Sequence, residues 1–344
     1  MQVTVLTGGS TPERNVAFAG AAQVVAALRD AGYQVTVVDT VEGVLSDRDE
    51  RDLLVPTVGK APPSEAVLAK LAERELGPAL VTLPEVRGAD LVFPVLHGRQ
   101  GEGGEVQTLL DGAGVPYAGS GPLGSALAMD KDLAKRLFQH AGVPTADWVM
   151  WPADDTAIAS LGFPLVVKPS KVGSTVGLTV VDRPADMAAA VAEAGRFDDE
   201  VVLEAFLPGR EYTVGILGTE ALAVGEIIPS HDIFDYECKY TPGMTEEIFP
   251  ADLSSALERS MRDLAYRAHR CLKLRDFSRV DFRLAADGSP HCLEVNTLPG
   301  LTSTSLLPQS AAAVGIPFAD LCTRICHLAL GRARSRNKAE TAGL

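Results

Sequence analysis

Apolar residues follow two different spacings in the N-terminal part of the chain. A short apolar run at residues 2–6 precedes a segment rich in turn residues, and helical spacing follows at residues 16–31. A second strand pattern covers residues 33–39. The order of strand, helix and strand predicts an open parallel α/β sheet, in which ligands bind at the carboxyl ends of the strands.

Patterns of both kinds alternate through the rest of the chain. The expected strands lie at 91–96, at 201–206 and on both sides of PSKVGSTVG, and the expected helices lie at 64–75, 126–141, 185–194 and 252–271. A Gly-Val-Pro corner after residue 141 indicates a domain boundary. The long polar and aromatic segment at 230–248 is typical of a lid.

The stretch FSRVDFRLAADGSPHCLEVNT, which starts at Phe277, predicts a β-hairpin. Alternation along its first arm places Arg279 and Asp281 on one face. Alternation along the second arm places Leu293 and Val295 on one face and the remaining three side chains on the other, namely Cys292, Glu294 and Asn296.

The dipeptide at residues 287–288, Asp-Gly, is a strong signal for a two-residue turn. That turn sets Asp281 opposite Glu294 and Arg279 opposite Asn296. Two facing carboxylates repel each other, and a hard cation reverses the sign of that interaction. Carboxylate and amide oxygens suit Mg²⁺ better than zinc, whereas a solvated polar face is the alternative interpretation. A register slip of one residue would scatter these ligands.

Two residues near the ends of N-terminal strands are further candidates. Glu13 follows Ser10 by three residues, so a capping box explains it without any function. His97 follows a buried strand and begins a glycine-rich segment. Ligand binding and a loop-stabilising hydrogen bond are equally consistent with that position.

The connection PSKVGSTVG follows Lys168 and contains Ser174. Its glycines and successive amides suit phosphate oxygens, whereas a flexible hairpin tip is the alternative. Glu204 and Glu211 are placed to bind an adenine amine and ribose hydroxyls, or to be solvated. GSGPLG at 119–124 matches G-x-G-x-x-G, but the acidic residue expected about 20 positions later is absent, so we discount a dinucleotide site.

Composition narrows the class of protein. The 344 residues are 46% hydrophobic and 22% charged, as in an ordinary globular protein. The net charge of −14 argues against a nucleic-acid binder. Five widely spaced cysteines indicate reduced thiols in a cytoplasmic protein, and for Cys322 and Cys326 we favour core packing over a metal site. Neither a signal peptide nor a membrane span is expected.

Taken in order, eight motifs resemble those of D-alanine–D-alanine ligases, which are ATP-grasp enzymes. The motifs are STPERNV, LHGRQGEGG, GSGPLGSALAMDK, VKPSKVGSTVG, VVLEAFLPGREYTV, FDYECKY, RVDFRL and LEVNTLPGLTSTSLLP. The resemblance covers about residues 2–330. It implies an α/β chain with an ATP-grasp fold and an N-terminal open parallel, Rossmann-like α/β domain. The expected domains are 1–122, 123–208 and 209–332, followed by a flexible tail at 333–344.

By this resemblance, ATP phosphorylates one D-alanine and the amine of a second D-alanine attacks the acyl phosphate. The metal ligands for two Mg²⁺ or Mn²⁺ ions are Asp281, Glu294 and Asn296. The ATP-binding residues are Lys131, Lys168, Glu204, Ala205, Leu207, Glu211 and Lys239. The residues on the substrate side are Glu13, His97, Arg279, Gly300, Ser305 and Leu306, with Ser174 and Tyr240 linking the lid to Glu13. Arg279 and the Gly300 amide would form the oxyanion hole.

Three departures and two rival functions qualify the resemblance. Gly103 and Ala17 stand where the family usually has Asp and Ser, and Ala205 replaces a common Lys. A D-alanine–D-lactate ligase, or a ligase for another acceptor, is one rival, although Tyr240 favours the dipeptide. A catalytically silent nucleotide-binding module is the other, and Arg279 argues against it. A homodimer is the expected assembly.

Overall fold

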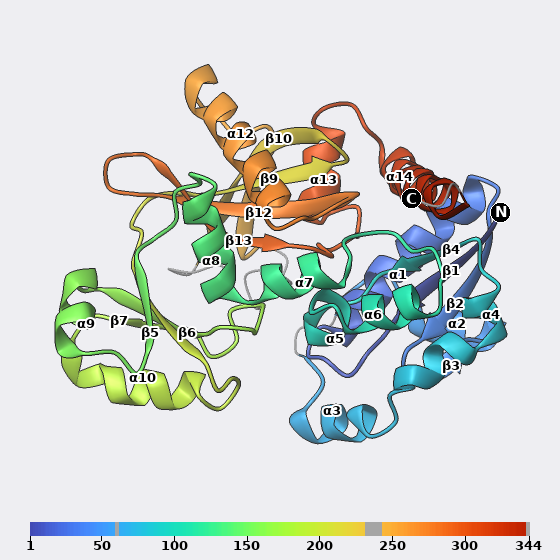
Figure 1. The fold of residues 1–344 in the computed structure, drawn as a ribbon, viewed down its shortest axis with the longest axis horizontal. Helices are drawn as coiled ribbons and strands as arrows, with labels where there is room; N and C mark the ends of the chain where they lie inside the picture. Colours follow the sequence, from blue (N-terminus) through green and yellow to red (C-terminus); the bar gives the residue numbers. More distant parts are fainter. Residues whose placement is uncertain (59–61, 231–242, 342–344) are drawn as a thin grey trace.

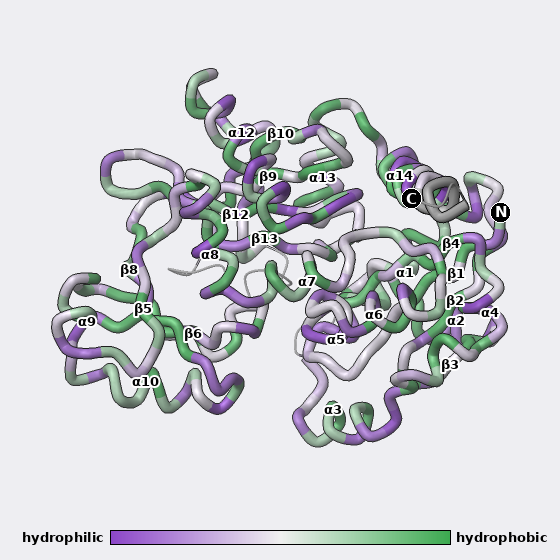
Figure 2. The backbone as a smooth tube through the Cα atoms, in the orientation of Figure 1, coloured by the Kyte–Doolittle hydropathy of each residue, from purple (hydrophilic) through white to green (hydrophobic). Residues whose placement is uncertain are grey.

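In the described part of the chain, three β-sheets and the helices that cover them form the fold shown in Figure 1. The structure is a computed structural model that describes residues 1–58, 62–230 and 243–341. Cys238, Lys239, Tyr240 and most of the expected lid lie outside the described residues. Figure 2 shows hydrophobic stretches gathered in the sheets, where they form the three cores described below.

The N-terminal sheet has the strand order β3-β2-β1-β4, and β1 pairs in parallel with both β2 and β4. The predicted open parallel sheet is therefore confirmed. Its strands are β1 (Gln2–Thr7), β2 (Gln34–Asp39), β3 (Gly43–Val44) and β4 (Leu91–Pro94). Its helices are α1 (Arg14–Asp30), α2 (Asp47–Leu53), α3 (Glu65–Ala72), α4 (Pro84–Arg87), α5 (Gly98–Glu102) and α6 (Glu105–Gly112), with a 3₁₀ helix at Gly77–Thr82.

The central sheet is antiparallel, with the order β5-β8-β6-β7. Its strands are β5 (Trp148–Trp151), β6 (Leu165–Pro169), β7 (Thr179–Val181) and β8 (Val201–Ala205), and α9 (Asp155–Leu161) and α10 (Met187–Ala194) cover it, with a 3₁₀ turn at Pro184–Asp186. Its core is small, with Leu165, Val167 and Leu203 at its centre. The other face of this sheet is consequently available to the site described below.

The C-terminal sheet is also antiparallel, with the order β11-β10-β9-β12-β13. Its strands are β9 (Glu211–Leu217), β10 (Glu220–Pro229), β11 (Thr245–Ile248), β12 (Phe277–Leu284) and β13 (Pro290–Asn296), and its helices are α12 (Ser255–Cys271) and α13 (Leu306–Ala312). Val280 and Phe282 point into the core beneath α12. Arg279 and Asp281 alternate with them and face away from that core.

One long helix was expected at 126–141, and this prediction is wrong. The chain forms α7 (Pro122–Met129) and α8 (Lys131–His140), separated at Asp130. The Asp130 carboxylate caps α8 by accepting a hydrogen bond of 3.0 Å from the Leu133 amide. The break follows from this cap, because Asp stabilises a helix start better than a helix interior. It places Lys131 in the first turn of α8.

The turn of the β12–β13 hairpin also differs from the prediction. The Ala285 amide bonds the Ser289 carbonyl at 2.8 Å, so three residues form the loop, and Gly288 takes its left-handed position with a φ of 80°. This longer turn moves the register by one residue. A β-bulge at Leu293 moves it back, so that Asp281 faces Glu294 and Arg279 faces Asn296, as predicted.

The bulge changes which side chains share a face of β13. Cys292 was expected on the face of Glu294, but it is fully buried in the core with Val295. Leu293 was expected to accompany Val295, but it lines a cavity together with Glu294. Both corrections follow from the extra residue, because a bulge places two successive residues opposite one partner residue.

The last helix, α14 (Phe318–Thr341), returns to the N-terminal unit and packs against α1 (Figure 1). Cys322 and Cys326 are buried in that core, and the four cysteines in the described part of the chain are free. The expected tail from residue 333 begins within this helix. Asp276 joins the units, because it accepts a hydrogen bond of 2.9 Å from the Gly119 amide and pairs with Arg332.

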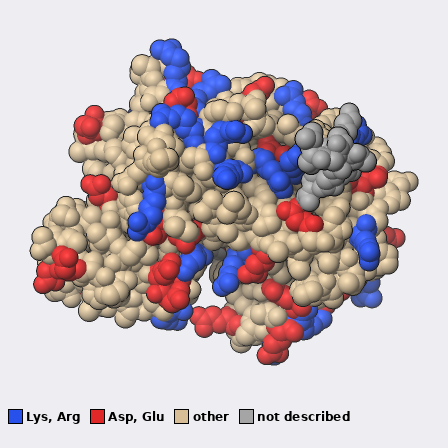
Figure 3. All heavy atoms as spheres, viewed as in Figure 1, with Lys and Arg blue, Asp and Glu red and all other residues tan. Residues whose placement is uncertain are grey.

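Charged residues of both signs lie on the face shown in Figure 3, where most Lys and Arg side chains gather over its upper half. Within the described residues, the helices are all too short or too polar to cross a membrane.

Candidate active site

Two adjoining cavities lie between the three sheets. The larger, of about 520 Å³, is bordered by the start of α1, by α5 and by the loop after β13. The smaller, of about 120 Å³, lies between β6 and β8 of the central sheet and β12 and β13 of the C-terminal sheet. Four residues border both cavities, namely Lys131, Gly173, Ser174 and Glu294. A ligand in one cavity can therefore reach a ligand in the other at this junction.

The structure divides the predicted site residues between the two cavities. The larger one is lined by Glu13, His97, Arg279, Asn296, Gly300, Ser305 and Leu306. The smaller one is lined by Lys168, Glu204, Ala205, Leu207, Glu211 and Asp281. The predicted residues that lie outside the described part of the chain are Lys239 and Tyr240. The others, which come from all three sheets, are brought together.

Apolar side chains form much of the smaller cavity, including Val166, Leu178, Phe206 and Leu293. The polar group at its inner wall is Glu204, which is 3% exposed. The alternative of a solvated Glu204 is therefore wrong. A cavity that combines apolar walls with fixed polar groups is typical of a small-molecule site.

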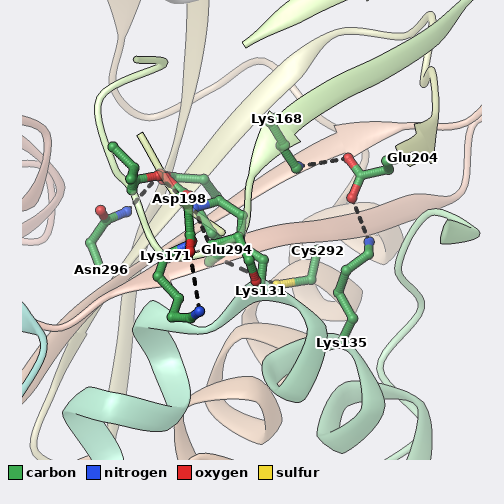
Figure 4. Close-up of polar contacts among 12 residues, drawn as sticks. Lys131, Lys135, Lys168, Lys171, Asp198, Glu204, Cys292, Glu294 and Asn296 are labelled. Atoms are coloured by element: carbon green, nitrogen blue, oxygen red, sulfur yellow. Dashed lines mark hydrogen bonds and ion pairs between the residues drawn. The ribbon is translucent and has the colours of Figure 1, made fainter. Parts of the chain in front are cut away.

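Glu204 lies between two lysines, as Figure 4 shows. One carboxylate oxygen accepts a hydrogen bond of 2.9 Å from Lys168 Nζ, and the other lies 2.7 Å from Lys135 Nζ. Burial by itself would raise the pKa of the Glu204 carboxyl, but Lys135 and Lys168 outweigh it and lower the pKa to about 2. The carboxylate is therefore a permanent hydrogen-bond acceptor. Sequence reasoning missed Lys135.

Asp281 is the centre of a polar network at the floor of the site. It accepts hydrogen bonds from Thr213 Oγ1 at 2.7 Å and from Asn296 Nδ2 at 2.9 Å. Arg279 forms an ion pair with Asp281, in which Nη2 donates a hydrogen bond of 2.8 Å to Oδ2. Thr213 was not predicted, since its place beside Asp281 depends on the pairing of β9 with β12. The network holds the carboxylate in one orientation.

Lys131 connects this floor to the loop between β6 and β7. Its Nζ lies 3.7 Å from Glu294 Oε2 and donates a hydrogen bond of 2.8 Å to the Val172 carbonyl. Burial lowers the pKa of Lys131, although Glu294 acts in the opposite direction. Lys131 borders both cavities, so its ammonium group can stabilise an anionic ligand at their junction.

The donor set on this floor fits magnesium or manganese. Two carboxylates, on Asp281 and Glu294, face each other across the hairpin, and the amide of Asn296 adjoins them. Among the described residues, no group of three or more His, Cys, Asp or Glu side chains has the arrangement of a metal site. Magnesium commonly takes one or two carboxylates and completes its shell with phosphate oxygens and water. The set therefore suits an ion that arrives with a nucleotide.

Glu13 receives a hydrogen bond from across the site. Ser174 Oγ, from the loop between β6 and β7, donates to Glu13 Oε1 at 2.6 Å. The capping-box interpretation is wrong, because the Glu13 side chain caps nothing and Ser10 bonds Glu75 instead. Helix α1 directs Glu13 into the larger cavity, where a carboxylate suits an ammonium group.

The loop that carries Ser174 is held in an unusual conformation. Ser174 and Thr175 have φ values of 57° and 63°, in the left-handed region where side chains cost about 1–2 kcal/mol each. Glycines were expected to supply this freedom, and Gly177 does so with a φ of 70°. The bonds from Ser174 to Glu13 and from Lys131 to this loop offset the cost. Such strain is concentrated at functional sites.

A second carboxyl, that of Glu102, lines the larger cavity with Glu13 and His97. It accepts a hydrogen bond of 2.8 Å from the Gly98 amide. Burial and the nearby Glu13 raise its pKa to about 8. Sequence reasoning did not single it out, although it lies in the same GEGG motif as Gly103. Glu247 also lines this cavity, and burial raises its pKa.

The loop after β13 forms the far wall of the larger cavity. Ser305 begins α13, and its Oγ accepts a hydrogen bond of 3.1 Å from the Thr302 amide. A Cβ at Gly300 would come within 2.8 Å of Ser305 Oγ, so this tight loop requires glycine. Gly300 and Arg279 line the same cavity, so a backbone amide and a guanidinium group are both available there as hydrogen-bond donors.

Comparison with known proteins identifies the family. Residues 2–120 match the family described as the D-Ala-D-Ala ligase N-terminus, and residues 137–327 match the corresponding C-terminus. A curated D-alanine–D-alanine ligase from Geotalea uraniireducens is 41% identical over 94% of this chain and 94% of its own length. One from Synechococcus sp. (strain JA-3-3Ab) is 38% identical over 97% of this chain and 95% of its own.

The chain belongs to the D-alanine–D-alanine ligase family.

Solved structures of family members share the fold. The D-alanine–D-alanine ligase from Coxiella burnetii has a TM-score of 0.81 at 27% identity, covering 99% of this chain and 97% of that chain. The ligase from Bacillus anthracis complexed with ATP has a TM-score of 0.76 at 27% identity, covering 98% and 99%. VanG D-Ala:D-Ser ligase from Enterococcus faecalis has a TM-score of 0.78 at 27% identity, covering 95% and 99%. The predicted ATP-grasp fold is confirmed.

The three departures from the usual motifs of D-alanine–D-alanine ligases lie in well-defined places. Ala17 is fully buried in α1, one turn after Glu13. Gly103 follows α5, where a Cβ would come within 2.5 Å of the Arg99 carbonyl oxygen. Ala205 ends β8, and its amide bonds the Asp147 carbonyl at 2.9 Å. The first two departures leave Glu13 and Glu102 as polar groups on that side of the cavity.

Proposed function

We propose that this protein uses ATP to join two D-alanine molecules into D-alanyl-D-alanine, a precursor of peptidoglycan, and releases ADP and phosphate. The observation that carries the proposal is the meeting of the two cavities at Lys131, Ser174 and Glu294. A nucleotide cavity that opens into an amino-acid cavity at a pair of opposed carboxylates suits phosphoryl transfer to a carboxylate. Membership of the family supports the same reaction.

ATP would occupy the smaller cavity with its base between the apolar side chains. In our assignment, Glu204 and the backbone of Ala205 and Leu207 bind adenine, and Glu211 binds the ribose. Lys168 and Lys131 contact the phosphates, together with Lys239 from the segment outside the described residues. These cations offset charge that develops during phosphoryl transfer.

Asp281, Glu294 and Asn296 would hold two Mg²⁺ or Mn²⁺ ions. When bound, such ions neutralise phosphate charge and hold the terminal phosphate in line with its acceptor. The protein's own contribution is orientation, because Thr213, Arg279 and the hairpin register fix the carboxylate of Asp281.

The first D-alanine would bind with its ammonium at Glu13, near His97. Its carboxylate oxygen attacks the γ-phosphorus of ATP, the bond to the bridging oxygen breaks, and ADP leaves with that electron pair. The product is D-alanyl phosphate. Bound substrates that fill the larger cavity would keep water away from this mixed anhydride, which hydrolysis would otherwise destroy.

The second D-alanine would bind with its carboxylate at Ser305 and Leu306. Its amine attacks the carbonyl carbon of D-alanyl phosphate, and Arg279 with the Gly300 amide stabilises the oxyanion that forms. The amine must lose a proton, and in our assignment Ser174 and Tyr240 help to position or deprotonate it. Collapse of the tetrahedral intermediate expels phosphate and leaves the peptide bond.

The domain boundaries and the assembly belong to the same proposal. We place the boundaries at 1–122, 123–208 and 209–332, because Pro122 begins α7 and a short connection separates β8 from β9. We infer a homodimer that acts in the cytoplasm, without nucleic acid or membrane as a partner.

Phosphate release from ATP tests the reaction. The protein is assayed with D-alanine alone, L-alanine alone, and D-alanine plus D-lactate, and products are weighed by mass spectrometry. We expect phosphate release with D-alanine, none with L-alanine, and a product with the mass of the dipeptide. No D-alanine-dependent phosphate release would refute the proposal, and a depsipeptide as the main product would identify a D-alanine–D-lactate ligase instead.

A further inference from the structure

Lys135 is a buried cation that lines neither cavity. It lies in α8 one turn after Lys131, and it is 1% exposed. Its Nζ is 2.7 Å from Glu204 Oε2, on the opposite side of the carboxylate from Lys168 (Figure 4). Lys168 borders the nucleotide cavity, whereas Lys135 approaches Glu204 from behind.

The ammonium of Lys135 is fixed by two further contacts, with Thr145 and with Trp148. It donates a hydrogen bond of 2.7 Å to Thr145 Oγ1, which in turn donates one of 2.8 Å to the Cys292 carbonyl. It also lies 5.0 Å from the centre of the Trp148 ring. These contacts come from the β5 segment and from β13. Lys135 therefore cannot follow a ligand into the cavity without losing all of them.

The two lysines differ in what they can do when a nucleotide binds. Lys168 is assigned to the phosphates, and any movement toward them weakens its bond to Glu204. The carboxylate would then be a buried charge without a partner, which is strongly unfavourable. Lys135 removes that difficulty because it stays with Glu204 in either state. Burial alone lowers the pKa of Lys135, while Glu204 opposes this effect.

We propose that Lys135 is a positioning residue that sets the choice of nucleotide base, by holding Glu204 as a hydrogen-bond acceptor aimed at the adenine cavity. The inference rests on the proposed function, in which Glu204 reads the base. An ionised carboxylate accepts hydrogen bonds and donates none. It therefore favours the 6-amino group of adenine and disfavours a 6-oxo group, which is itself an acceptor.

The test compares ATP with inosine triphosphate, which carries a 6-oxo group in place of the 6-amino group. For Lys135→Met we expect kcat/KM for ATP to fall at least about tenfold, mainly through KM. The ratio of kcat/KM for ATP to that for inosine triphosphate should also fall, while the KM for D-alanine stays the same. Lys135→Arg should restore most of the ratio, because it keeps the cation.

The matched control is Arg332→Met, which removes the cationic partner of another buried carboxylate, Asp276; neither residue lines the two cavities. It should lower stability and leave the base ratio unchanged. If Lys135→Met does not fold, Thr145→Val removes one anchor of Lys135 and should shift the ratio in the same direction by less. An unchanged ratio in the folded variants would overturn the proposal.

Calorimetric binding of the two nucleotides separates this inference from the proposed function. Wild-type protein that ligates D-alanine, with an unaltered base ratio in the variants, would leave the function standing and refute the role of Lys135. If the wild-type protein prefers ATP but ligates nothing, and Lys135→Met loses that preference, the role of Lys135 stands and the proposed function is refuted.

Discussion

Ser174 donates a hydrogen bond of 2.6 Å to Glu13 across 161 positions of sequence. The bond joins the loop of the central sheet to the first helix of the N-terminal unit. Ser174 borders both cavities, and Glu13 borders the larger one. Since hydrogen bonds to charged groups are among the stronger ones, this contact couples the position of the loop to the carboxylate of Glu13.

Ser174→Ala tests that link. We expect the KM for the first D-alanine to rise about tenfold, because Glu13 loses a charge-assisted bond and the left-handed loop loses an anchor. Hydrogen exchange of residues 170–178 should increase in the nucleotide-free protein. Ser160→Ala, at an exposed hydroxyl on α9, is the control and should change neither. An unaltered KM would show that the bond plays no part in substrate binding.

Asp281→Asn and Glu294→Gln test the assignment of these two carboxylates as metal ligands. Each should lower kcat at least about 1000-fold, because the ions supply several kcal/mol of stabilisation to the transition state. Thermal unfolding should show that both variants stay folded. Glu220→Gln, an exposed carboxylate at the start of β10, should keep full activity. Near-normal turnover in both site variants would refute the metal assignment.

Glu102 predicts a pH dependence of stability. Its pKa is raised from 4.5 to about 8, so the folded protein keeps a proton that the unfolded chain loses between these values. The free energy of unfolding therefore falls as pH rises from about 4.5 to about 8. Glu102→Gln should be more stable than wild type by about 1–3 kcal/mol at pH 8.5 and equally stable at pH 5. This range is smaller than the full pKa shift would give, because Glu102 borders an open cavity where solvent screens the charge.

Melting temperatures of the nucleotide-free protein at the two pH values measure this effect. Glu105→Gln is the matched control, because Glu105 forms only an exposed pair with Arg99 in the adjoining helix. It should follow the wild-type profile. A Glu102→Gln profile that runs parallel to wild type would show that Glu102 does not hold this proton.

The pair of Asp276 and Arg332 should hold α14 against the rest of the protein. Arg332→Met leaves a buried carboxylate without its cation, so we expect a loss of about 3–5 kcal/mol of unfolding free energy in chemical denaturation. Arg334→Met, at an exposed position of the same helix, should change it by less than about 0.5 kcal/mol. Equal effects from the two substitutions would contradict this role.

The facing pair of carboxylates at the floor of the site was predicted from the sequence. The pairing of Asp281 with Glu294 followed from periodicity and a turn signal. The turn was wrong by one residue, and the bulge at Leu293 compensated for it. No feature of the sequence indicates the bulge, because its cause is the packing of Cys292 into the core while Glu294 faces the cavity.

Contacts between distant elements lay beyond sequence reasoning. Lys135 occupies an ordinary polar position of an amphipathic helix, and only the packing of α8 against β8 reveals its partner Glu204. Asp130 lies within an apparently continuous helical pattern. Because Asp is a preferred N-cap residue, it was a signal for the break between α7 and α8. Glu13 matched a local capping motif, but its side chain accepts a hydrogen bond from the distant Ser174 and does not cap α1.

In the proposed reaction, ATP activates the carboxylate of D-alanine at the junction of the two cavities. Its most direct test uses D-alanine labelled with ¹⁸O in the carboxylate, followed by mass spectrometry of the released phosphate. An acyl phosphate transfers one labelled oxygen to phosphate in each turnover, and we predict that result. Unlabelled phosphate from a reaction that still forms the dipeptide would contradict the account.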